Sequence, residues 1–144
     1  MLFSSPLPQI DHDRIVAAIQ SAEQRTSGEI RVAIARRPTE DPLSDARKHF
    51  ERLEMHRTAA RNGVLIFVAP RSRNFAVIGD TGVHEKCGDG FWTGLADAMT
   101  RQFQAGDFEA AIILGVERTG ELLAAHFPPS GSDQNELPDD VDDV

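Results

Sequence analysis

The chain has 144 residues, of which 26% are charged and 40% are hydrophobic, a composition typical of a single soluble globular domain rather than a disordered or membrane-embedded protein. Six of its 23 acidic residues lie in the last twelve positions, so the rest of the chain carries 17 acids against 15 bases. A nearly neutral body disfavours a nucleic-acid partner, because such partners are bound by basic surfaces that neutralise phosphates.

The first predicted elements are a helix and a strand. Asp11 is a typical N-cap residue, and the apolar positions that follow it recur every three or four residues until Thr-Ser-Gly at 26–28. Residues 29–35, EIRVAIA, alternate instead with a period of two. This pattern predicts a strand with one buried face, formed by Ile30, Val32 and Ile34.

A second helix, over residues 44–56, precedes two further strands. Residues 64–69, VLIFVA, are apolar on both faces and rich in β-branched side chains, which predicts a central strand covered on both sides. Residues 70–74, PRSRN, form a short turn into a third strand at 75–79. We expect residues 80–90 to be a loop rich in glycine and acids, followed by a helix that ends near Gly106. Asp107 should then cap the last helix, whose apolar stripe reaches Phe127.

The order strand, helix, strand predicts a right-handed parallel crossover, and the short turn at 70–74 predicts an antiparallel hairpin. The predicted fold is therefore an α/β protein: a three-layer α/β/α sandwich with a small mixed sheet between flanking helices. We expect an N-terminal extension at 1–9, one domain at 10–128 and an acidic tail at 129–144. Within the tail, residues 130–133 are expected to be mobile, while Leu137 and Val141 are expected to dock on the domain.

This topology sorts the charged residues between the two ends of the sheet. Arginines leave the first and second predicted strands at one end, while Asp80 emerges at the other end, beside Gly28, Glu29 and Asn62. Ligands of open α/β sheets usually bind outside the carboxyl ends of parallel strands, which favours an anion site on the arginines. Loop arginines are also often merely solvated. The four candidates for this site are Arg36, Arg37, Arg71 and Arg73.

Three enzyme motifs in the stretch VIGDTGVHEKCGDGFW, residues 77–92, do not hold. The triplet Asp-Thr-Gly at 80–82 occurs once, whereas aspartic proteases need two such carboxylates in an all-β fold. Cys87 lacks the arginine of a C-x5-R phosphatase loop, because that position is Thr93. His84 and Cys87 have the spacing of two zinc ligands, but the chain has no second cysteine.

Two interpretations of the acids in this stretch stay open. Hard cations such as calcium or magnesium prefer several carboxylate and carbonyl oxygens, which predicts a metal site at Asp80, Glu85 and Asp89. Alternatively, Asp89 caps the helix entered at Gly90 and Asp80 closes a turn. The other four histidines, His12, His49, His56 and His126, lie in or beside predicted helices and are expected on the surface.

The chain shows no sign of a membrane or a secretory location. The single cysteine excludes an internal disulfide, and the first nine residues lack the basic and apolar segments of a signal peptide. The longest strictly apolar run, at 64–69, is far too short to span a bilayer. We expect a cytoplasmic protein without a membrane span.

The order and spacing of several segments are similar to those of the TPM domain family, which occurs in chloroplast-lumen and photosystem II repair proteins and in bacterial proteins. The segments are TSGEIRVAIA, then RNGVLIFVAPRSRNFAVIGDTGVHEKCGDGFW, then FQAGDFEAAIILGVERTGELLAAHF, which together span about residues 10–128. The resemblance implies an α/β/α sandwich, divalent-cation binding in some members and phosphatase activity in some. It assigns the acidic loop of the family to Asp80, Glu85 and Asp89.

The function expected from this resemblance is divalent-cation binding with at most weak phosphohydrolase activity. The metal would polarise a phosphoryl oxygen or activate water, and His84 is a candidate acid or base. The alternative is a non-catalytic interaction module, which would bind a protein partner at the arginine end or through the acidic tail.

Overall fold

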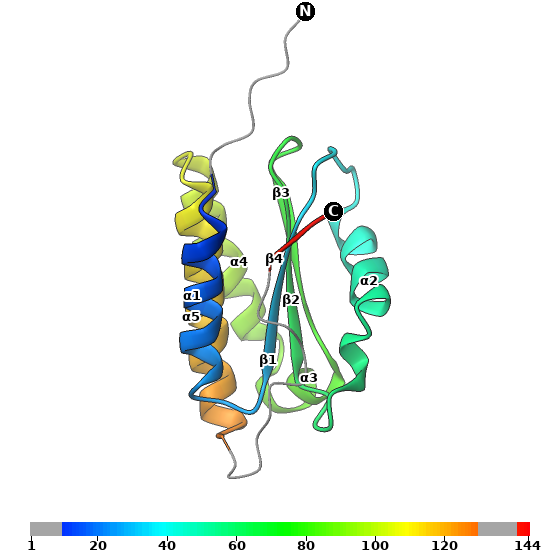
Figure 1. Cartoon of the computed structure of the whole chain (residues 1–144), viewed down its shortest axis with the longest axis vertical. Coiled ribbons are helices and arrows are strands. Elements are labelled where there is room, and N and C mark those ends of the chain that lie inside the picture. Colours follow the sequence, from blue (N-terminus) through cyan, green and yellow to red (C-terminus); the bar gives the residue numbers. More distant parts are fainter. Residues whose placement is uncertain (1–9, 130–140) are drawn as a thin grey trace, which may run out of the picture.

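The computed structural model describes residues 10–129 and 141–144. Helices cover both faces of a four-stranded sheet, in agreement with the predicted three-layer α/β/α sandwich (Figure 1). In chain order the elements are α1 (His12–Glu23), β1 (Glu29–Ile34), α2 (Pro42–Arg52), the 3-10 helix η1 (Met55–Arg57), β2 (Gly63–Ala69), β3 (Asn74–Gly79), α3 (Thr81–Cys87), α4 (Asp89–Gln104), α5 (Phe108–His126) and β4 (Val141–Asp143).

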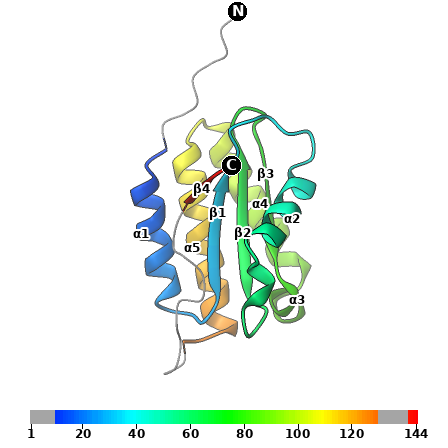
Figure 2. The same ribbon diagram turned by 45° about the vertical axis from the view of Figure 1, so that its right-hand side comes forward.

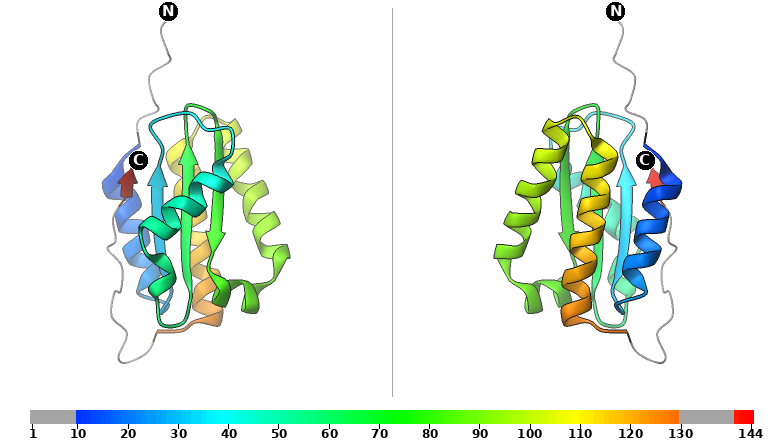
Figure 3. Two further views of the ribbon diagram at one scale, coloured as in Figure 1. Left: turned by 90° about the vertical axis from the view of Figure 1, so that its right-hand side faces the viewer. Right: turned by 90° about the vertical axis from the view of Figure 1, so that its left-hand side faces the viewer.

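The sheet separates two hydrophobic cores. Helices α1, α4 and α5 lie on one face and α2 lies on the other, as the two opposite views in Figure 3 show. The larger core contains Ile30 and Val32 of β1 together with residues of α1, α4 and α5. The smaller core packs Ala33 of β1 against Ala46 and Phe50 of α2. None of the helices within residues 10–129 and 141–144 combines the length and the apolar composition that a membrane crossing requires.

The strand order is β3-β2-β1-β4, with β1 and β2 parallel and β2 and β3 antiparallel. The predicted crossover and hairpin are therefore both present. The fourth strand was not predicted: β4 runs parallel to β1 along its outer edge, and the two lie side by side in Figures 1 and 2. Val141 is 7% exposed and joins the larger core, so the expected docking of this residue is confirmed. Leu137 and residues 130–133 lie outside the described residues.

Two elements differ from the sequence expectation. Strand β1 was expected to be half-buried, but every one of its positions is buried, because α2 covers the face opposite to α1 and α5. Helix α2 begins earlier than expected, at Pro42 behind the N-cap Asp41, and ends at Arg52. The chain then turns at Glu54, whose φ of 57° is left-handed, so η1 is a separate short turn rather than a continuation of α2.

The predicted N-caps of α1 and α5 and the predicted stop after α4 are confirmed. The Asp11 carboxylate accepts hydrogen bonds from the amides of Asp13 and Arg14 at the start of α1. Gly106 has a φ of 85°, a left-handed conformation that glycine adopts without strain, and it stops the chain after α4. The Asp107 carboxylate then accepts a hydrogen bond from the amide of Ala110 and caps α5.

Candidate functional site

The acidic end of the sheet forms where β1 and β2 begin and β3 ends. Glu29 of β1 is in register with Gly63 of β2, and the amide of Asp80 donates a hydrogen bond to the carbonyl of Gly63 at 2.9 Å. The amide of Glu29 donates to the carbonyl of Asn62 at 3.3 Å. The predicted meeting of these residues at one end is therefore present in the structure.

Asp80 is the most constrained acid of this end. It is only 4% exposed, and its two carboxylate oxygens accept hydrogen bonds from Arg61, Nε to Oδ2 at 2.7 Å and Nη2 to Oδ1 at 2.9 Å. Oδ1 also accepts a hydrogen bond from the amide of Thr81 at 2.7 Å and thereby caps α3. A two-pronged arginine pair of this kind is one of the strongest charge-assisted contacts in proteins.

The backbone around Arg61 is held so that its side chain reaches Asp80. The amide of Gly82 donates to the Arg61 carbonyl at 2.9 Å, and a Cβ atom at Gly82 would lie only 2.2 Å from the Ala60 carbonyl oxygen. Only glycine therefore permits this close approach at position 82. Arg61 itself has a φ of 51°, which is unusual and strained for a residue with a side chain.

The Arg61 side chain lies between the buried Asp80 carboxylate and the solvent. Its side chain is 49% exposed, whereas that of Asp80 is 4% exposed. The hydrogen bonds from Arg61 to Asp80, and then the attraction between the two charges, raise the pKa of Arg61. The sequence analysis did not identify Arg61, although it lies directly before the Asn-Gly pair that opens β2.

Residues 81–90 are not the loop that the sequence predicted. Residues 81–87 form helix α3, and Asp89 is the first residue of α4, where Gly88 is the N-cap residue with a φ of 72°. The expectation that Asp89 caps α4 is therefore wrong, because the cap position lies one residue earlier. Glu85 and Asp89 are both exposed, on either side of Gly88. Among residues 10–129 and 141–144, no three His, Cys, Asp or Glu side chains come close enough to hold a metal ion.

His84 and Cys87 both belong to α3. His84 is exposed and its ring lies against that of Trp92, with the centroids 5.8 Å apart. The amide of His84 donates to the Asp80 carbonyl at 3.2 Å, so the histidine lies one helical turn from the Asp80–Arg61 pair. Burial raises the pKa of the Cys87 thiol, against a smaller opposite effect of Lys86. A raised pKa disfavours the thiolate, the form in which a cysteine acts as a nucleophile.

The end of the sheet opposite to Asp80 carries the four arginines of the predicted anion site, and the structure brings two of them into contact. Arg71 Nε donates to the carbonyl of Arg36 at 3.0 Å, which links the loop after β1 to the β2–β3 turn. Arg73 has a φ of 56° and lines a cavity of about 460 Å³, together with Phe75 and Phe103. Arg37 is exposed. The anion site predicted on these four residues stays a prediction.

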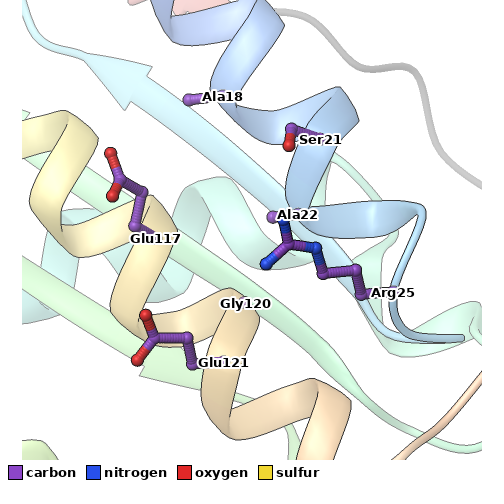
Figure 4. Close-up of a pocket in the computed structure, with 7 residues that line it drawn as sticks. All are labelled: Ala18, Ser21, Ala22, Arg25, Glu117, Gly120 and Glu121. Atoms are coloured by element: carbon purple, nitrogen blue, oxygen red, sulfur yellow. The ribbon is translucent and has the colours of Figure 1, made fainter.

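A second, smaller cavity of about 190 Å³ lies between α1 and α5 (Figure 4). Its floor is made of small residues, among them Ala22 and Gly120, and its rim carries Arg25, Glu117 and Glu121. A Cβ atom at Gly120 would lie 2.7 Å from the Cβ of Ala22. The floor of this cavity is therefore a close packing contact between α1 and α5.

Comparisons with known proteins agree on one family. The family model of the TPM domain matches residues 5–122. The NMR structure of the BA42 protein from the psychrophilic bacterium Bizionia argentinensis superposes with a TM-score of 0.88 at 34% identity, over 99% of this chain and 100% of that one. The N-terminal domain of the cg2496 protein from Corynebacterium glutamicum superposes with a TM-score of 0.59 at 15% identity, over 97% of this chain and 91% of that one, a likeness of fold alone. No curated protein matches the chain.

Proposed function

This chain belongs to the TPM domain family, and on that premise we propose that it binds a divalent cation, calcium or magnesium, at Asp80, Glu85 and Asp89. One observation carries the proposal: the buried Asp80 carboxylate is balanced by Arg61, an arginine whose side chain is half exposed. A buried carboxylate needs a counter-charge, and here that charge sits on a flexible side chain that can turn into solvent.

The cation would take the place of the Arg61 guanidinium. When Arg61 turns outward, both oxygens of Asp80 become available to a hard cation. Glu85 and Asp89 are exposed, so their side chains are free to turn toward the same point. Because the described residues contain no ready-made cluster of three ligands, this rearrangement weakens binding. We expect a dissociation constant of roughly 10⁻⁴ M, within the range of weak calcium modules.

In this proposal, phosphatase activity depends on the same site. A bound cation supplies polarisation of a phosphoryl oxygen or an activated water molecule. His84 stands one turn of α3 from Asp80 and is exposed, so its imidazole would act as the acid or base. The expected activity is weak, because the raised pKa of Cys87 disfavours the thiolate that a cysteine nucleophile needs.

Thermal unfolding tests the cation site. With a dissociation constant of ~10⁻⁴ M, about 1 mM calcium or magnesium adds about 1.4 kcal/mol to the free energy of unfolding. For a domain of this length the melting temperature should rise by roughly 3–6 °C relative to the protein in chelator. Equal melting temperatures in chelator and in both metals would refute the cation site.

Variants of Arg61 test whether a cation replaces the Arg61 guanidinium at Asp80. Arg61→Gln should melt below the wild type in chelator, because the Asp80 charge loses its partner, but should show a larger rise with metal because no guanidinium competes. Asp80→Asn should abolish the rise. Arg57→Gln is the matched control, since Arg57 lies in the same connection between α2 and β2, is 69% exposed and pairs only with Glu54 among the described residues. A rise in Arg61→Gln no larger than that of Arg57→Gln would contradict the exchange.

A phosphatase assay separates catalysis from binding. Hydrolysis of p-nitrophenyl phosphate that requires the metal and is lost in Asp80→Asn would support an enzyme. If the metal binds without any turnover of phosphate esters, the chain is a non-catalytic cation-binding module.

A further inference from the structure

Strand β4 is held on the sheet by main-chain pairing and by the side chains of Val141 and Asp142. Val141, Asp142 and Asp143 stand in parallel register with Val32, Ala33 and Ile34. The next residue, Val144, donates its amide to the Ile34 carbonyl at 2.8 Å and accepts from the Arg36 amide at 2.7 Å. Main-chain pairing of this kind accepts any extended segment, and its selectivity comes from the side chains on either side of it.

The side chains of β4 alternate between two different environments. Val141 is buried in the larger core, on the α1 side of the sheet. Asp142 points to the α2 side, where its Oδ1 accepts a hydrogen bond from Arg31 Nη2 at 3.0 Å. Asp143 returns to the α1 side, where its Oδ1 lies 3.5 Å from His12 Nε2, and the two side chains are 40% and 42% exposed. The edge therefore selects an apolar residue followed by an acid.

Arg31 supplies the charged group that selects an acidic side chain at this edge. It is buried in the middle of a strand, with a side chain that is 8% exposed, and Asp142 is its only ion-pair partner among the described residues. The pair is incomplete: Arg31 Nε and Asp142 Oδ2 are both buried, and neither has a hydrogen-bond partner within the described part of the chain. Each such atom weakens the attachment of β4, because a buried polar group without a partner is unfavourable.

The stretch of the β1 edge on which a strand can pair is short. Toward the start of β1, the amide of Ile30 donates to Glu23 Oε2 at 2.7 Å, so a side chain already covers that position. Docking of a strand is therefore limited to residues 32–36. A segment that binds here must place its acidic side chain over Arg31 and its apolar side chain in the slot of Val141.

We propose that the outer edge of β1, from Val32 to Arg36 with Arg31 beside it, is a docking site for an extended acidic segment of a partner protein, and that residues 141–144 occupy this site within the same chain. Charge complementarity with the buried Arg31 identifies the partner as acidic. A second copy of this chain offers only the contact that residues 141–144 already make at high effective concentration. A partner segment that completes the Arg31 pair can displace them.

The test uses the full chain with Asp142→Arg, which sets two like charges against each other and should release residues 141–144. The reporter is hydrogen exchange of the Arg36 amide, which donates to Val144 in the structure. Its exchange should become at least roughly tenfold faster, while amides of α5 stay protected and show that the fold is intact. Asp143→Arg is the matched control, because the charged group that Asp143 contacts within the described residues is the partly exposed His12, and exchange should change less than about twofold.

A peptide then tests the docking site directly. The sequence of residues 137–144, LPDDVDDV, added to the Asp142→Arg protein should slow the Arg36 exchange again, and should bind the wild type at least roughly tenfold more weakly, because there the site is already filled. The same peptide with lysine in place of the residue that matches Asp142 should not bind.

Three results would overturn the proposal. Unchanged Arg36 exchange in Asp142→Arg would show that the main chain alone holds β4. Equal binding of the acidic and the lysine peptide would remove the role of Arg31. A concentration-dependent dimer of the wild type, detected by light scattering and abolished by Asp142→Arg, would assign the edge to a second copy instead of a separate partner.

Discussion

His49 shows how a residue expected on the surface becomes part of the core boundary. It lies on α2, and its ring stacks on Phe67 of β2 with the centroids 5.6 Å apart and an interplanar angle of 23°. Burial, followed by the nearby charge of Arg52, lowers the pKa of His49, while Asp45 and Asp142 act in the opposite direction. Protonation of His49 is therefore less favourable in the folded state than in the unfolded state.

This pKa predicts a pH dependence of stability. The unfolded chain takes up the proton near its ordinary pKa of about 6.5, before the folded protein does, so the free energy of unfolding should fall as the pH drops from about 7 through that value and on to the lowered pKa. His49→Phe keeps the stacked ring without the proton. Urea unfolding between about pH 5 and 7.5 should show a shallower loss for the variant, and parallel curves for the two proteins would contradict the prediction.

At the same scale, the sequence identified Asp80 but not its partner. Arg61 and Asp80 are 19 positions apart, and their contact depends on the register of the β2–β3 hairpin. Val64 pairs with Gly79 in that register, and continuing it past the strand ends brings residue 61 opposite residue 82. The length of the turn at 70–74 sets this register. The residue types of Arg61 and Asp80 and their spacing along the chain do not reveal that the two side chains meet.

Helix α5 packs so closely on α1 that only glycine, which has no Cβ atom, fits at position 120 without a shift of the helices. Gly120→Ala would place a methyl group 2.7 Å from the Cβ of Ala22, which cannot rotate away, so the helices must separate. We expect a net loss of about 1–3 kcal/mol in the free energy of unfolding, larger than the gain of up to ~1 kcal/mol in helix propensity.

Gly94 provides the matched control for this prediction. It lies in α4, where an added Cβ would meet no atom within 4 Å, so Gly94→Ala should stabilise the protein by about 0.5–1 kcal/mol. Chemical unfolding of both variants measures the difference. A Gly120→Ala protein as stable as Gly94→Ala would show that α1 and α5 tolerate separation.

The elements that the sequence predicted are those with a clear apolar pattern, either a continuous run or a stripe. Strand β2 is apolar at every position, and α5 carries its buried residues on one stripe. Two elements that the sequence missed, α3 and β4, lack such a pattern. Helix α3 has a single buried residue, Val83, and it starts where Gly82 meets the carbonyl of Arg61. Strand β4 has three residues, of which two are acidic, and its position depends on Arg31, more than a hundred positions away.

At the scale of the molecule, the sequence predicted the layers and the connection of β1, β2 and β3, because parallel crossovers and short hairpins follow general rules. It also predicted which end of the sheet gathers the acids. It did not predict the fourth strand, β4, beside β1, because an acidic segment after the last helix resembles a disordered tail in composition. The place of Asp80 at that end was predicted, its pairing with Arg61 was not, and the cation site itself stays a prediction.

The remote pairing of β4 has a consequence for the order in which the protein folds. Contacts between Val32 and Val141 close a loop of more than a hundred residues, whereas the hairpin of β2 and β3 closes locally. Loop closure of that length delays a contact, so β4 should join after the rate-limiting step. Val141→Ala, which removes about 1–2 kcal/mol of buried apolar contact, should therefore accelerate unfolding by roughly 5- to 30-fold and leave the refolding rate nearly unchanged, whereas Val68→Ala in the hairpin should slow refolding. Stopped-flow refolding and unfolding of the two variants distinguish these outcomes, and a slowed refolding of Val141→Ala would place β4 in the folding nucleus.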